Sequence, residues 1–282
     1  MKNCLVQPFL KWAGGKRQLM DKIKENLPND IKELKYYEPF VGGGAVFLEL
    51  EPKKAVINDF NSELINVYEV IRDNVEELIH ELKEYKEKNS QEYFYEVREL
   101  DRNTEVYSNM SNVKKAARII YLNKTCYNGL FRVNSRGEFN TPYGRYKNPN
   151  IVNEAVLKAV SIYLNSSKNI KIMSGDYKES LRRISKKSFV YFDPPYWKIS
   201  DSSSFTGYTM NGFTEENQVE LRDVCRMLDK KGVKFMLSNS DTPFIRELYK
   251  EFSIISVDAT RSINSNSQKR GTVGEVLVKN YV

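Results

Sequence analysis

The stretch KYYEPFVGGGAVFLELEPKKAVINDF, residues 35–60, decides the fold of this chain. It predicts a strand that ends at Phe40, a glycine-rich turn, a short helix and a second strand that ends at Asp59. Two parallel strands joined by a helix are the opening unit of a Rossmann-like sheet. We therefore expect an α/β fold in which ligands bind beyond the carboxyl ends of the strands.

Further strand patterns extend this unit toward the end of the chain. They lie at residues 169–176, 188–193 and 233–240, followed by a terminal pair at 252–260 and 274–282. Residues 61–164 differ, because their periodic charged and apolar positions favour several helices and no convincing strand. We predict a catalytic domain of residues 1–60 and 165–282, interrupted by a mostly helical inserted domain of residues 61–164.

The composition is that of a globular protein without a membrane span. Of the 282 residues, 40% are hydrophobic and 29% are charged, and no apolar run approaches the roughly 18 residues that cross a bilayer. Three widely spaced cysteines suggest neither a disulfide framework nor a thiolate metal site, and a cytoplasmic protein fits best. The only histidine, His80, lies in a helical pattern, so we expect chemistry that needs no imidazole and no metal.

The charge is unevenly distributed along the chain. Between Asn61 and Glu105, 13 acidic residues face 6 basic ones, whereas between Lys114 and Lys147 eight basic residues face one acid, Glu138. The first stretch is explained by solvated helix faces. The second, rich in Asn, Tyr and Gly, favours a surface that binds nucleic-acid phosphates.

The glycine turn and the acid after the second strand indicate a cofactor site. Glycines at this turn let the backbone approach a ligand at a helix N-terminus, and Asp59 can accept hydrogen bonds from ribose hydroxyls. Together they favour an adenosine-containing cofactor, either NAD or S-adenosylmethionine. KWAGGKR, residues 11–17, is no phosphate-binding loop, because Leu10 and Arg17 replace the required Gly and Ser or Thr.

The segment DPPY, residues 193–196, ends the strand at 188–193 with chemistry suited to an amino group. The Asp193 carboxylate and the Pro194 carbonyl, held rigidly by Pro195, form an acceptor pair for a planar NH2 group. Hydrogen bonds to this pair leave the nitrogen lone pair free to attack an electrophilic methyl group. Tyr196 offers a ring on which a base can stack.

Taken together, these motifs resemble those of the Dam-type and DpnII-type DNA adenine methyltransferases. EPFVGGGAVF at 38–47, NDFN at 58–61, KWAGGK at 11–16 and DPPY occur in the order of that family over nearly the whole chain. The resemblance implies S-adenosylmethionine as cofactor, a Rossmann-like catalytic domain and an inserted target-recognition domain. The cofactor-pocket positions that it implies are Trp12, Lys16, Glu38, Phe40, Gly42, Gly43, Gly44, Asp59, Asp176, Tyr177 and Asp193.

The segment YNGLFRVNSRGEFNTPYGRYKNP, residues 127–149, resembles the recognition segment of the family members that methylate GATC. The resemblance implies that Arg132 reads a guanine and that Lys11 reads the outer guanine, while phosphate contacts position the protein. The DNA-binding residues that it implies are Lys11, Asn128, Leu130, Arg132, Arg136, Pro142, Arg145, Tyr146 and Lys147.

The sequence therefore predicts an enzyme that methylates adenine in double-stranded GATC and flips the base into the DPPY pocket. A cognate restriction endonuclease is a possible partner, and no motif requires an oligomer. Methylation of the cytosine amino group remains open, although that group of enzymes more often has Ser in place of Asp193. An NAD-dependent oxidoreductase and a non-catalytic DNA-binding module are the alternatives of other classes. Residues 197–213 are expected to form a flap over the flipped base, and residues 262–271 a basic loop that touches the DNA backbone.

Overall fold

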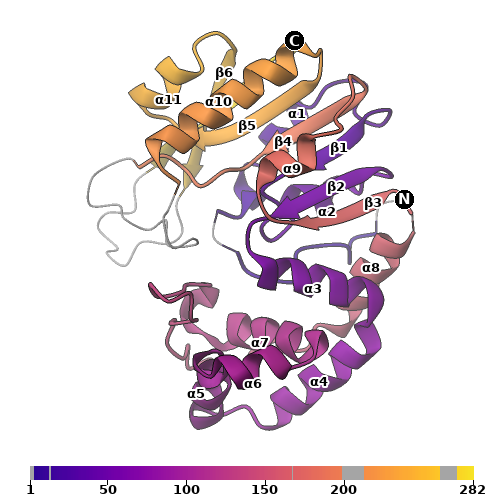
Figure 1. Ribbon diagram of the computed structural model, residues 1–282, viewed down its shortest axis with the longest axis vertical. Helices are drawn as coiled ribbons and strands as arrows, with labels where there is room; N and C mark the ends of the chain where they lie inside the picture. The colour runs from indigo at the N-terminus through magenta and orange to yellow at the C-terminus, as the bar shows by residue number, and fades with distance from the viewer. Residues whose placement is uncertain (1–2, 13, 167, 199–212, 261–271) are drawn as a thin grey trace.

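The computed structural model describes residues 3–12, 14–166, 168–198, 213–260 and 272–282. Within them a central sheet carries helices on both faces, and a group of helices lies below the sheet in the view of Figure 1. The strands are β1 (Lys35–Glu38), β2 (Ala55–Asp59), β3 (Ile170–Ser174), β4 (Ser188–Phe192), β5 (Lys234–Ser240), β6 (Ser253–Thr260) and β7 (Thr272–Lys279).

The strand order confirms the predicted Rossmann-like α/β sheet. The order is β3-β2-β1-β4-β5-β7-β6; the first five strands are parallel, and β7 runs antiparallel to both β5 and β6. Tyr36 of β1 pairs with Ala55 of β2 on one side and with Phe189 of β4 on the other. The order therefore reverses between β1 and β4, which is the position where a ligand-binding crevice forms in an open α/β sheet.

Helices bury both faces of the sheet, as a parallel sheet requires. Successive strand side chains point to opposite faces, so Tyr36 packs with α1 to α3 and α8, whereas Tyr37 packs with α9 to α11. All five residues of β4 are buried in consequence. The helices outside the β2–β3 connection are η1 (Lys16–Gln18), α1 (Met20–Glu25), α2 (Ala45–Leu50), α9 (Tyr177–Leu181), α10 (Glu215–Lys230) and α11 (Pro243–Leu248).

The long connection between β2 and β3 is helical, as expected for residues 61–164. One hydrophobic cluster runs from Tyr36 and Ile57 in the sheet to Tyr121 and Phe139 in this connection, so the two predicted domains share a core. The boundaries at 61 and 164 stay a prediction. The helices are α3 (Ser62–Asp73), α4 (Val75–Glu87), α5 (Gln91–Glu99), η2 (Leu100–Arg102), α6 (Thr104–Asn109), α7 (Asn112–Thr125), η3 (Tyr127–Gly129) and α8 (Glu154–Asn165).

Residues 130–141 form a hairpin on this helical group, termed the 130–141 hairpin below. Its arms are joined by a backbone bridge between Val133 and Phe139 and by a hydrogen bond of 2.9 Å from Asn140 N to Arg132 O. The turn closes through Gly137 N, which donates to Asn134 O at 3.0 Å. The loop-like sequence thus has a defined backbone.

The structure also bears on the histidine, the cysteines, the membrane question and the two loops considered in the sequence analysis. His80 is on α4 with 79% of its side chain exposed, and its Nε2 is 3.4 Å from Glu84 Oε1. The three cysteines are free. Among the described residues, no helix is long and apolar enough to cross a membrane. Most of the predicted flap at 197–213 and all of the loop at 262–271 lie outside the described residues.

The glycine turn tolerates no side chain at Gly44. Gly44 has φ +70° as it begins α2, and an added Cβ would meet the Tyr68 hydroxyl, which is held by donating to Gly42 O at 3.0 Å. We predict that Gly44→Ala lowers the free energy of unfolding by about 2–4 kcal/mol in urea titrations, from left-handed strain plus overpacking. Gly137→Ala is the control, because its φ is +82° in open space and strain alone costs about 1 kcal/mol. Equal losses in the two variants would contradict the steric argument.

Candidate active site

The adjacent carboxyl ends of β1 and β4 hold the centre of the candidate site. Asp193 follows β4 directly, and its Oδ1 lies 2.7 Å from Lys16 Nζ. Lys16 is only 4% exposed, so this ion pair is shielded from bulk water. The same ammonium lies 4.7 Å from the centroid of the Tyr196 ring. The KWAGGK and DPPY motifs therefore meet at this ion pair, although Lys16 and Asp193 are 177 positions apart in the sequence.

Side chains of β5 and β7 hold the two ends of DPPY, Asp193 and Tyr196. Ser238 Oγ donates to Asp193 Oδ1 at 3.0 Å, and the Tyr196 hydroxyl donates to Glu275 Oε2 at 2.8 Å. Sequence reasoning missed Ser238 and Glu275. The signal for Ser238 is the polar SNS at residues 238–240, which ends an otherwise apolar strand at the ligand-binding edge.

Buried amides fix the backbone of the DPPY segment. Gln218 Nε2 donates to Pro195 O at 3.0 Å, and Gln218 Oε1 accepts from Asn239 Nδ2 at 3.1 Å. Asn239 Oδ1 in turn accepts from Trp197 N at 3.0 Å. Gln218 and Asn239 are fully buried, so these bonds are strongly maintained. The Pro195 carbonyl is thereby occupied, whereas no donor among the described residues reaches the Pro194 carbonyl.

Burial raises the pKa of the two carboxyl groups at the centre. The pKa of Asp193 lies above its ordinary value because of burial, although Lys16 and Ser238 oppose the shift. Burial raises the pKa of Glu38 to about 8, and the Asp193 charge adds to this, while a 2.5 Å hydrogen bond from the Tyr36 hydroxyl opposes it. Glu38 therefore keeps its proton to a higher pH than an exposed carboxyl does, while Lys16 pairs directly with Asp193.

The glycine turn and Asp59, both predicted cofactor-pocket positions, are joined by a hydrogen bond. Gly42 N donates to Asp59 Oδ2 and Asn61 N donates to Asp59 Oδ1, both at 2.9 Å. Burial raises the pKa of Asp59, and these backbone bonds oppose the shift. Each carboxylate oxygen retains a lone pair that can accept a ribose hydroxyl.

Trp12 connects the glycine turn to the inserted helices. A Cβ added at Gly42 or Gly43 would stand 3.0 Å from the Trp12 side chain. On its other side, the indole stacks on Phe131 with centroids 5.0 Å apart and an interplanar angle of 25°. Trp12 is therefore placed between the predicted cofactor pocket and the 130–141 hairpin.

Aromatic side chains line the edge where β1, β2 and β3 end. The Phe40 ring lies 4.9 Å from the Tyr177 ring, and the buried Tyr177 hydroxyl has no partner among the described residues. Asp176 begins α9 and accepts a hydrogen bond from Lys178 N at 2.8 Å. Phe60, directly after Asp59, is 68% exposed; sequence reasoning missed it, and only its exposure marks it. The carboxylates and the exposed ring of Phe60 together fit an adenosine group.

Most of the predicted DNA-binding residues are on the surface. The exposed ones are Lys11, Arg132, Arg136, Pro142, Arg145, Tyr146 and Lys147, with Asn128 and Leu130 half-buried. Of the basic residues counted in the one-sided stretch, Arg118 is not available as a phosphate surface, and Lys124 is only partly exposed. Arg118 is 1% exposed, and half-buried Lys124 has its pKa lowered by burial. Charge counts cannot distinguish a buried cation from a solvated one.

A buried amide brings Lys11 and the start of the recognition segment together. Asn123 Oδ1 accepts from Lys11 N at 2.9 Å, and its Nδ2 donates to Lys11 O at 2.8 Å and to Gly129 O at 3.1 Å. Asn123 was not singled out from the sequence, because it occupies an ordinary helical position. Exposed Tyr127 adjoins this contact and was also missed.

Comparisons with known proteins bear on the activity of this site. Residues 12–263 match the profile of the family described as D12 class N6 adenine-specific DNA methyltransferase. The chain is 50% identical to Type II methyltransferase M1.LlaDCHI of Lactococcus lactis subsp. cremoris, covering 98% of this chain and 96% of the relative. It is 47% identical to Type II methyltransferase M.MjaIII of Methanocaldococcus jannaschii (98% and 99% covered) and 38% identical to the DNA adenine methylase of Escherichia coli K12 (95% and 93% covered).

The protonation of Glu38 predicts a pH-dependent stability. The folded state keeps this proton up to about pH 8, whereas the unfolded chain loses it near the ordinary pKa of 4.5. Between these values the folded state binds more protons, so stability falls as pH rises. We predict that Glu38→Gln removes this part of the decline, measured as unfolding free energies at about pH 5 and about pH 8.

The control for this prediction is Glu25→Gln, which removes a carboxyl that is 58% exposed. It should leave the decline of the wild type unchanged. An equally steep decline in Glu38→Gln and the wild type would contradict a raised pKa at Glu38.

Proposed function

The chain belongs to the D12 class of N6 adenine-specific DNA methyltransferases, and on that premise we propose that it methylates the N6 amino group of adenine in double-stranded GATC with S-adenosylmethionine as donor. Membership of this class confirms the resemblance and removes the other three readings: cytosine methylation, the NAD-dependent oxidoreductase and the non-catalytic module.

The observation that carries the catalytic proposal is the acceptor pair at the end of β4. The Pro195 carbonyl is bonded to Gln218, while the Pro194 carbonyl has no donor among the described residues and Asp193 is paired with Lys16. An NH2 group that donates one hydrogen to each acceptor is held in a single orientation. Its nitrogen lone pair then faces away from both acceptors, toward the methyl donor.

The residues of the site orient the nitrogen and receive its proton. When bound, the cofactor supplies an electrophilic methyl group. The ion pair with Lys16 favours the charged form of Asp193 against the effect of burial. As the nitrogen–methyl bond forms, the nitrogen becomes acidic, and the Asp193 carboxylate that accepts its hydrogen bond is placed to take the proton. No histidine is needed.

The cofactor pocket that we propose lies along the carboxyl ends of β1 to β3. Gly42, Gly43 and Gly44 let the backbone approach the ligand, Asp59 accepts the ribose hydroxyls, and Glu38 ends β1 just before the glycine turn. The exposed face of Phe60 and the ring of Tyr177, which packs on Phe40, are matched to the adenine end of the ligand. The remaining pocket residues are Trp12, Lys16, Phe40, Asp176 and Asp193.

An adenine stacked within a DNA duplex cannot reach the DPPY segment at the end of β4, so we propose that the base is flipped out. Tyr196, whose hydroxyl is tied to Glu275, gives a fixed ring for the flipped base. Stacking of this kind contributes about 1–3 kcal/mol.

The guanine readout that we propose rests on Arg132. Its Nε donates to Asn140 Oδ1 at 2.9 Å, which orients the guanidinium, and its two terminal nitrogens have no partner among the described residues. These nitrogens match the O6 and N7 acceptors of guanine. Lys11, beside Asn128 and Leu130, is proposed to read the outer guanine. Arg136, Arg145 and Lys147 contact phosphates, while Pro142 and the ring of Tyr146 adjoin the duplex.

A digestion assay tests the target sequence. DNA from cells that express the protein should resist an endonuclease blocked by methylated GATC and be cut by one that requires it; the opposite pattern would refute GATC as the target. Relatives named Type II methyltransferases support a cognate restriction endonuclease as partner of a cytoplasmic enzyme. Nothing in the proposal requires an oligomer.

We predict that Asp193→Asn lowers methyl transfer by about 100-fold or more, because the amide removes the charge paired with Lys16 and brings a donor toward the substrate amino group. The measurement is transfer of labelled methyl groups to unmethylated GATC duplexes, with urea unfolding to show that the variant is folded. The control is Asp223→Asn at a carboxylate that is 58% exposed. Near-normal turnover in Asp193→Asn would refute the assignment of the site.

We predict that Arg132→Ala lowers the preference for GATC over a single-guanine variant by about 10-fold or more, since a bidentate contact contributes about 1–3 kcal/mol of discrimination. Arg136→Ala on the same hairpin is the matched control. Loss of a phosphate contact weakens binding to all sequences and leaves their ratio unchanged. If the two variants behave alike, Arg132 does not read a base.

A further inference from the structure

Arg118 of α7 is a buried cation that must be compensated inside the protein. With 1% exposure, its guanidinium has lost nearly all hydration. Its terminal nitrogen lies 2.7 Å from Asp101 Oδ2, and its Nε donates to Val97 O at 2.9 Å at the end of α5. The guanidinium also stacks over the Tyr107 ring of α6 at 5.1 Å. Arg118 therefore fixes η2, α5 and α6 against α7.

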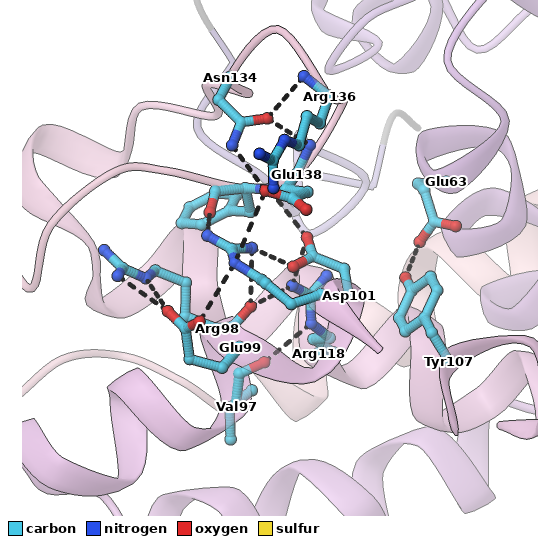
Figure 2. Close-up of polar contacts among 12 residues, drawn as sticks. Glu63, Val97, Arg98, Glu99, Asp101, Tyr107, Arg118, Asn134, Arg136 and Glu138 are labelled. Atoms are coloured by element: carbon cyan, nitrogen blue, oxygen red, sulfur yellow. Dashed lines mark hydrogen bonds and ion pairs between the residues drawn. The ribbon is translucent and has the colours of Figure 1, made fainter. Parts of the chain in front are cut away.

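Asp101 passes this constraint to the 130–141 hairpin. Its Oδ2 accepts a hydrogen bond from Phe139 N at 2.8 Å, and its Oδ1 pairs with Arg102. Arg102 donates to Phe139 O at 2.6 Å. Both backbone groups of Phe139 are thus held by the ion-pair cluster of Asp101, Arg102 and Arg118. Figure 2 shows Asp101 between Arg118 and the turn that carries Asn134 and Arg136.

The position of Phe139 determines where the Arg132 side chain lies. Asn140 follows Phe139, donates its N–H to Arg132 O at 2.9 Å and accepts from Arg132 Nε through its Oδ1. The Phe139 ring is buried against Phe131, with centroids 5.6 Å apart. A shift of the Phe139 backbone would therefore move Asn140 and rotate the guanidinium of Arg132.

We propose that the Asp101–Arg102–Arg118 cluster positions Arg132 for base readout, as a specificity device that itself touches no DNA. This inference rests on the proposed function, because it requires that Arg132 reads a base. Buried ion pairs are seldom retained for net stability, since apolar replacements are often as stable. The four hydrogen bonds and ion pairs that meet at Asp101 and Phe139 give this cluster a geometric role instead.

The test is a double-mutant cycle between Arg102→Met and Arg132→Ala. The readout is the ratio of kcat/KM on GATC to kcat/KM on one comparison duplex. That duplex carries the single guanine replacement that the Arg132→Ala variant distinguishes least from GATC. Arg102→Met should lower this ratio by about 10-fold, and in the Arg132→Ala background it should cause no further loss. The matched control is Arg72→Met, an arginine of the same inserted segment whose side chain is 29% exposed and pairs with Asp73; it should leave the ratio unchanged.

The outcomes separate this inference from the proposed function. If Arg132→Ala lowers the ratio but Arg102→Met does not, or lowers it equally in both backgrounds, positioning by the cluster is refuted. If the wild type shows no preference for GATC, or Arg132→Ala does not change it, the proposed recognition fails and this inference fails with it. If Arg102→Met does not fold, Arg102→Lys takes its place; it keeps the charge but cannot span Asp101 and the Phe139 carbonyl, and at least about a threefold loss is expected.

Discussion

The ion pair between Lys16 and Asp193 is the interaction on which the rest of the site depends. A buried ammonium group requires a partner, and this one draws a loop near the N-terminus against the end of β4. The same short segment carries Trp12 on the glycine turn and Lys11 on the amide of Asn123. Residues 11–16 therefore join Asp193, the glycine turn and the inserted helices.

The second constraint is the amide network beneath DPPY. Two successive proline carbonyls are chemically alike, and either can accept a hydrogen bond from a substrate. Gln218, held by Asn239, donates a hydrogen bond to the Pro195 carbonyl. The Pro194 carbonyl has no hydrogen-bond donor among the described residues. In the proposed mechanism, residues from α10 and β5 that touch no substrate therefore decide how the substrate amino group is oriented. Rigid placement of this kind is what methyl transfer requires, because the geometry of attack sets the rate.

The basic character of the inserted segment divides into two physical roles. Arg132, Arg136, Arg145 and Lys147 are solvent-exposed and suited to DNA, whereas Arg118 is enclosed by Asp101 and the carbonyls at the end of α5. We propose that the exposed charges attract and read the duplex, whereas the buried one gives the hairpin a fixed base. The shared hydrophobic core continues this support from the sheet to the hairpin, through Trp12, Phe131 and Phe139.

By itself, the sequence determined the strand–glycine turn–helix–strand unit, the helical connection and the chemistry of DPPY, because side-chain periodicity, glycine and proline act over a few residues. It also predicted that Asp59 ends the second strand, as it does in β2; the roles assigned to Asp59 and to the exposed arginines stay predictions. Only the tertiary structure decided that Lys16 meets Asp193, that the Pro195 carbonyl is the occupied one, that Glu275 holds Tyr196 and that Arg118 is buried. Each of these depends on contacts between residues more than ten positions apart, where packing and the exclusion of water select the partner and local sequence carries no information about it.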